Sequence, residues 1–133
     1  MEVSIIIVII LLILILLNRY QGKSPGIILY EDYFNISGMY GLTVNYRDIS
    51  NIEIVSEMPN IGIRTFGYNF MSVCKGYFIL ENIGKAYLNL NLKNPPFIRI
   101  ILENDACIFI NLNNEKDTRE LFDNLVHITL KNK

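Results

Sequence analysis

Histidine and cysteine are scarce in this chain, whose 133 residues include one histidine and two cysteines. Cys74, Cys107 and His127 are too few and too dispersed to form a ligand cluster, so we predict no metal site. The state of the cysteines depends on the compartment. In the cytoplasm both are expected to remain small, partly buried thiols, whereas a Cys74–Cys107 disulfide would accompany export.

Sequence motifs of common enzyme sites are also missing. The chain contains no G-x-x-x-x-G-K, no G-x-G-x-x-G and no H-E-x-x-H, which are the minimum parts of phosphate-loop, dinucleotide and zinc-protease sites. A nucleophilic cysteine needs a base within reach, and no pattern brings His127 to either cysteine. The adjacent carboxylates Glu31 and Asp32 would point to opposite faces of a strand. We predict that the protein is not an enzyme and uses no cofactor.

An excess of positive charge is missing as well. All twelve lysines and arginines follow Leu17, and of the thirteen acidic residues only Glu2 precedes it, which leaves twelve of each sign in the rest of the chain. Binding to a nucleic acid needs a basic excess or a cationic run. We therefore expect no nucleic-acid partner.

What the chain does contain is a continuous apolar segment near its N-terminus. Val3 to Leu17 is interrupted by a polar side chain only at Ser4. As a helix these residues would rise about 22 Å, against about 30 Å for the hydrocarbon core of a bilayer, so Met1 and the flank Asn18 to Tyr20 must complete the span. Their apolar side chains favour insertion by roughly 6 to 7 kcal/mol. We predict a membrane anchor over residues 1–20.

The charges beside this segment bear on its fate and its orientation. Glu2 stands where a signal peptide has a basic region, and Leu16 to Tyr20 offers no small-residue cleavage site, so we favour an uncleaved anchor over an export signal. Arg19 and Lys23 follow the segment and no cation precedes it, which places the remainder of the chain in the cytoplasm. Residues 21–26 form a turn-rich linker to a domain over residues 27–133.

From residue 27 onward the hydrophobic pattern has a period of two, which is typical of strands with one buried face. The alternation is strictest in Tyr40 to Arg47 and in Ala86 to Leu92. Five further strands are predicted at Ile28–Ile36, Asn51–Val55, Gly76–Leu80, Phe97–Glu103 and Cys107–Leu112. An antiparallel meander is favoured by short turns at Ser37–Gly38, Asn82–Gly84 and Asn104–Asp105, and it is interrupted at Lys93–Pro96.

The period changes to that of a helix after Asn113 and Asn114, either of which can be the N-cap. Glu115 and Asp117 lie in the first turn, where the helix dipole favours acidic residues. An apolar stripe follows, formed by Leu121, Phe122, Leu125, Val126 and Ile128. We predict a mainly β fold in which seven antiparallel strands form a barrel or bent sheet, with this C-terminal helix capping one open end.

Several short segments resemble, in their order and spacing, the bacterial pleckstrin-homology-like (PH-like) domain family that follows N-terminal membrane segments. Within Leu29 to Leu125 they are Gly41–Ile49, the connection from Met58–Pro59 to Arg64–Tyr68, Lys75–Phe78, Pro95–Ile98 and Phe109–Asn111. The resemblance implies a PH-like fold in a membrane setting, and no shared chemistry. Lipid-binding eukaryotic relatives hold several lysines and arginines around the first hairpin loop. Here that loop, Asn35 to Met39, has no cation, so phosphoinositide binding is not expected.

The stretch RTFGYNFMSVCKGYF, residues 64–78, combines glycines, aromatic side chains and two cations. An aromatic groove with a cation could hold a peptide or an anionic head group, and the candidate binding residues are Arg64, Tyr68 and Lys75. The competing explanation, which we favour for most of the stretch, is that its aromatic residues are core and its glycines allow the sheet to bend.

These observations predict a non-catalytic PH-like module, held at the cytoplasmic membrane face by one helix, that binds a protein partner through a sheet edge or a loop surface. Two alternatives stay open. The domain could instead bind a lipid or small ligand, which a cavity of several hundred Å³ would favour, or it could be an exported binding protein with a signal sequence.

Overall fold

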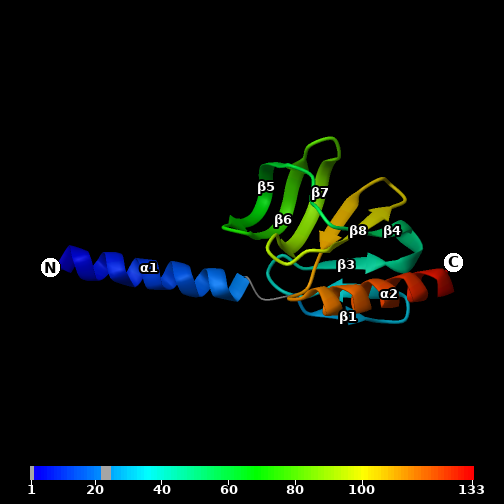
Figure 1. Ribbon diagram of the computed structural model, residues 1–133, viewed down its shortest axis with the longest axis horizontal. Helices are drawn as coiled ribbons and strands as arrows, with labels where there is room; N and C mark the ends of the chain where they lie inside the picture. Colours follow the sequence, from blue (N-terminus) through cyan, green and yellow to red (C-terminus); the bar gives the residue numbers. More distant parts are fainter. Residues whose placement is uncertain (1, 22–24) are drawn as a thin grey trace.

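The computed structural model describes residues 2–21 and 25–133, and the described chain is mainly β with a helix near each end (Figure 1). Helix α1 spans Glu2–Gln21 and helix α2 spans Glu115–Lys131. The predicted contribution of Met1 to the anchor lies outside the described residues. So do Lys23 and the middle of the predicted linker, residues 22–24.

Helix α1 is longer than the apolar segment that predicts it. It continues past Leu17 to Gln21, and its 20 residues correspond to about 30 Å of rise, which matches the hydrocarbon thickness of a bilayer. The side chains from Val3 to Leu17 are exposed, and the helix projects away from the β-rich part of the molecule (Figure 1). By length and composition α1 can cross a membrane, and a signal sequence meets the same criteria.

The strands between the helices form two sheets in the described chain. The smaller sheet is antiparallel, with strands β1 (Ile27–Leu29), β2 (Tyr33–Ile36) and β3 (Leu42–Asn45). A short 3-10 helix, η1 (Tyr46–Asp48), leads to the larger sheet. Its strands are β4 (Ile49–Val55), β5 (Ile61–Phe70), β6 (Val73–Leu80), β7 (Gly84–Asn91), β8 (Phe97–Leu102) and β9 (Cys107–Ile110).

The number of strands corrects the prediction, because the described residues form nine strands and not seven. The strand predicted over Ile28–Ile36 is a hairpin, since the chain turns back at Tyr30 and the Tyr30 amide donates to the Tyr33 carbonyl at 2.8 Å. The segment between Pro59 and Tyr68, predicted to be a connection, belongs largely to β5. The apolar alternation of β5 changes phase between Ile63 and Phe66, where the register against β6 also shifts, so the sequence does not mark it as one continuous strand.

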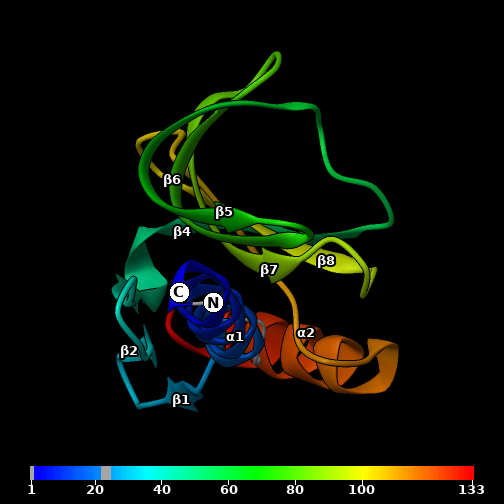
Figure 2. The same ribbon diagram turned by 90° about the vertical axis from the view of Figure 1, so that its left-hand side faces the viewer.

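The strand order of the larger sheet also differs from a meander. The order is β4-β8-β9-β7-β6-β5, so β9 lies between β8 and β7 and runs parallel to β7. The sheet is strongly bent and arches over the space next to α1, with β1 and β2 on one side and α2 on the other (Figure 2). It does not close into the predicted barrel, because β4 and β5 each keep one edge without a strand partner in the described chain.

Apolar side chains fill both faces of the bent sheet. One cluster lies between the larger sheet, the smaller sheet and α2, and it includes Phe34, Tyr46 and Ile98. A second cluster lies on the other face and includes Phe78, Leu88 and Phe109. Helix α2 packs against β4, β8 and η1 in the first cluster. The interior is therefore occupied by side chains.

The C-terminal helix follows its prediction closely. Asn114 is the N-cap, because its Oδ1 accepts from the Asp117 amide at 2.8 Å. Of the predicted stripe, Leu121 and Leu125 are buried, and Phe122 and Ile128 pack against the same cluster. The stripe thus holds α2 along the sheets.

Candidate functional site

The stretch RTFGYNFMSVCKGYF forms most of the β5–β6 hairpin. Gly67 and Gly76 face each other across the two strands, with φ angles of 140° and 117°. A Cβ added at Gly67 would lie 2.1 Å from the Lys75 carbonyl oxygen, so the strands approach too closely for any side chain there. The structural explanation of these glycines is confirmed.

The aromatic residues of the same stretch divide into two groups. Phe78 in β6 is fully buried, and Tyr77 packs edge-on against Tyr87, with ring centres 5.6 Å apart. In β5, by contrast, Phe66 is 66 % exposed and Phe70 is 45 % exposed. The expectation that the aromatic residues of the stretch are core is therefore correct for β6 and wrong for β5, which lies at the edge of the sheet.

Of the three predicted binding residues, the structure brings two together. Tyr68 and Lys75 are direct partners across the hairpin, so their side chains share one face of the sheet. Arg64 is opposite Phe78 in β6. Successive residues of a strand point to alternate faces, so Phe78, three residues after Lys75, lies on the opposite face of the sheet from Lys75. Arg64 is therefore exposed on the other face and is separated from the Tyr68–Lys75 pair.

The Tyr68–Lys75 pair faces the end of α1. The Tyr68 hydroxyl donates to Oδ1 of Asn18 at 3.1 Å, and the Asn18 amide donates to the sulfur of Met71 at 3.5 Å. Burial, and secondarily the proximity of Tyr40, raise the pKa of Tyr68. Burial lowers the pKa of Lys75, which is half-buried. This face of the hairpin contacts α1.

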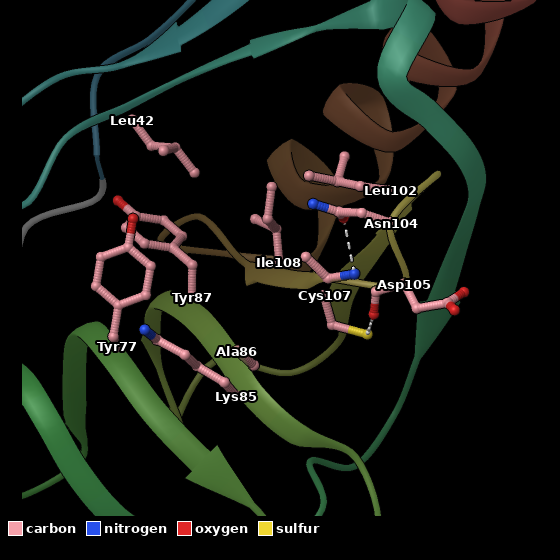
Figure 3. A pocket seen from close by; sticks show the side chains of 11 residues that line it. Leu42, Tyr77, Lys85, Ala86, Tyr87, Leu102, Asn104, Asp105, Cys107 and Ile108 are labelled. Atoms are coloured by element: carbon pink, nitrogen blue, oxygen red, sulfur yellow. Dashed lines mark hydrogen bonds between the residues drawn. The ribbon is translucent and has the colours of Figure 1, made fainter.

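A groove of about 430 Å³ opens between β3 and the strands β6, β7 and β9 (Figure 3). Leu42, Tyr77, Tyr87 and Ile108 give it apolar walls, and the ammonium of Lys85 lies 5.5 Å from the centre of the Tyr77 ring. The sequence analysis missed this groove. Its walls come from separate strands and turns, and no local motif marks residues that only the fold brings together.

The histidine and the two cysteines considered as catalytic groups lie in different environments. His127 is exposed on α2, whereas Cys74 and Cys107 are buried and free. Burial raises the pKa of Cys74 to about 11, so its thiolate is rare at neutral pH. Among the described residues no group of three potential ligands (His, Cys, Asp or Glu) is placed to hold a metal ion.

Comparisons of the chain with protein-family models, with curated proteins and with solved structures find no match. The geometry of the hairpin, the groove and the free sheet edges is therefore the basis for a functional proposal.

Proposed function

We propose that this chain is a non-catalytic PH-like interaction module, anchored at the cytoplasmic membrane face by α1, that binds an extended segment of a protein partner along the free edge of β5. The apolar helix supports the anchor, and Arg19 after it supports the orientation. The resemblance in segment order and the C-terminal helix packed on a β structure support the PH-like assignment.

The observation that carries the proposal is the edge of β5. This strand has ten residues, and in the described structure it pairs with β6 alone. An unpaired edge presents backbone N–H and C=O groups to which an incoming strand can hydrogen-bond. Five consecutive residues from Gly62 to Phe66 are exposed, and Ile63 at 68 % exposed offers an apolar contact beside those backbone groups.

The same edge has features that restrict which segment can bind. Its register against β6 shifts between Ile61 and Arg64 and again between Arg64 and Phe66. Such irregularities discourage pairing with arbitrary strands. The exposed guanidinium of Arg64 would favour a partner segment that carries an acidic residue. Arg64 is the candidate binding residue that this proposal retains at the edge, whereas Tyr68 and Lys75 face α1.

Site-specific photo-cross-linking in native membranes tests the proposal. A photoreactive phenylalanine analogue at Ile63 or Phe66 is expected to give one discrete adduct, and peptide mapping should locate it in a single extended segment of the partner. The matched control is Glu120, which is also exposed but lies on α2. Adducts that are absent at β5, or identical at β5 and Glu120, would contradict binding at the edge.

The groove favours a second function, the binding of a small apolar ligand. Its volume of about 430 Å³ is in the range of ligand sites, and its walls are mostly apolar. It is a surface groove, because the interior of the bent sheet is filled by its two apolar clusters. A fluorescent fatty-acid probe should bind the native chain and lose binding in Ala106→Phe, which fills the groove. Equal binding by both proteins would exclude this site.

A further inference from the structure

The tip of the β5–β6 hairpin lies beside the point where α1 leaves its apolar segment. Asn18 is the first polar residue after Leu17, and its side chain is hydrogen-bonded to both Tyr68 and Met71 of the hairpin. If α1 spans a bilayer, Asn18 lies near the boundary between hydrocarbon and head groups. The hairpin tip must then lie at the same depth, next to lipid.

The side chains at the tip are apolar although they are exposed. Met71 is 72 % exposed and occupies the turn with a φ of 56°, a conformation in which asparagine or glycine is usual. Phe70 precedes it. The Leu92 amide donates to the Ser72 carbonyl at 2.8 Å, which places a third exposed apolar residue beside the turn. We call Phe70, Met71 and Leu92 the hairpin tip.

Cations adjoin, in the sequence, both the hairpin tip and the residue of α1 that it contacts. Lys93 follows Leu92 and is exposed, and Arg19 follows Asn18 at the end of α1 and is also exposed. Apolar side chains that enter the boundary layer of a bilayer, with lysine or arginine next to them at the head groups, are typical of segments that lie in a membrane surface. The polar backbone of the turn stays hydrated at this depth, because the head-group layer contains water.

From this arrangement we infer that the hairpin tip dips into the surface of the same bilayer that α1 crosses, so that the domain is held to the membrane at a second point. The inference rests on the proposed anchoring by α1. Lipid is the occupant because the Asn18 contacts place the hairpin tip against the emerging helix, which lipid surrounds at that depth. The contact fixes the tilt of the domain and leaves the β5 edge, from Ile63 to Phe66, to rise from the membrane surface.

Tryptophan fluorescence provides the test, because the chain contains no tryptophan. Met71→Trp, Phe70→Trp, Ile9→Trp and Leu130→Trp are each reconstituted, as the full chain, in phosphatidylcholine vesicles with lipids brominated at defined acyl positions. Ile9 lies nine residues before Asn18, about 14 Å along the helix, and therefore near the middle of the hydrocarbon core. Leu130 is exposed at the far end of α2.

We expect the two tip variants to lose fluorescence most with lipids brominated near the head groups, and Ile9→Trp to lose it most with lipids brominated near the bilayer centre. Leu130→Trp should keep its fluorescence with both. Loss at Ile9 without loss at either tip position overturns the tip contact and leaves the anchor intact. A blue-shifted emission at the tip without quenching assigns the tip to a protein contact and overturns the inference. Absence of quenching at Ile9 overturns the anchor, and the tip contact with it.

Discussion

Strands β5 and β7 belong to the same bent sheet, yet they are under opposite constraints. In β7 five consecutive residues, Ala86 to Leu90, are buried, because the strand has a neighbour on each side and apolar clusters on both faces. In β5 five consecutive residues, Gly62 to Phe66, are exposed at the edge. Folding therefore determines the side chains of β7, whereas those of β5 are available for binding.

The largest difference between the two strands is expected when one side chain in each is truncated. Leu88→Ala in β7 removes a fully buried side chain and should cost about 2–5 kcal/mol of unfolding free energy. Ile63→Ala in β5 should change it by less than about 0.5 kcal/mol. Thermal unfolding of the full chain in detergent, followed by circular dichroism, measures both. Similar losses would mean that β5 is a core strand.

The close approach of β5 to β6 predicts the next largest effect. Gly67→Ala combines a strained positive φ with a clash against the Lys75 carbonyl and should cost at least about 1–3 kcal/mol. Gly38→Ala is the matched control, since Gly38 also has a positive φ but no atom within 4 Å of the added Cβ. The same unfolding measurement should show a smaller loss for Gly38→Ala. Equal losses would indicate strain without a clash.

Alkaline pH should reveal the burial of Cys74 in β6, a strand paired on both sides. Burial raises the pKa of this thiol from 9.0 to about 11, so above pH 9 the unfolded chain loses a proton that the folded chain keeps. The stability that the neutral thiol contributes is fully present below pH 9 and is lost as the pH rises toward 11. The resulting decrease in unfolding free energy is about 1 kcal/mol at pH 10. Unfolding of the native chain and of Cys74→Ala from pH 8 to pH 10 isolates this component. Parallel pH profiles would count against it.

The smallest effect on stability is expected at Arg64, where binding should change instead. Arg64→Ala removes an exposed cation from the β5 edge and should alter the unfolding free energy by less than about 0.5 kcal/mol. The yield of the Ile63 photo-adduct should nevertheless fall. Lys116→Ala, an exposed cation on α2, should leave that yield unchanged. An undiminished adduct in Arg64→Ala would remove Arg64 from the site.

The parts of the fold that were predictable are those in which apolar residues recur with a regular period in the sequence. The alternation of Ala86 to Leu92 predicts β7, and the Asn114 cap with the stripe at Leu121 and Leu125 predicts α2. Strand β5 was missed because its apolar alternation changes phase between Ile63 and Phe66, where the register against β6 is irregular. The position of β9 between β8 and β7 was missed because a short apolar strand can pair with several other strands. Its sequence does not indicate which of them become its neighbours in the complete sheet.

The candidate sites were less predictable than the fold, since they join residues that are distant in the sequence. Tyr68 and Lys75 were expected in a site, and their hairpin pairing follows from their nearness in the chain. The contact of Tyr68 with Asn18 spans 50 residues, and no local pattern indicates it. The same reason explains why the groove between Leu42 and Ile108 has no signature in the sequence.

The central position of β9 has a consequence for the growing chain. Strands β5, β6 and β7 can pair as soon as they are made, and β4 can pair with β8, but Cys107–Ile110 is the strand that joins these two halves. Until it emerges from the ribosome, β7 and β8 each present an apolar edge to the cell. A chain that stops before Cys107 should therefore remain as two unjoined half-sheets that are prone to aggregation.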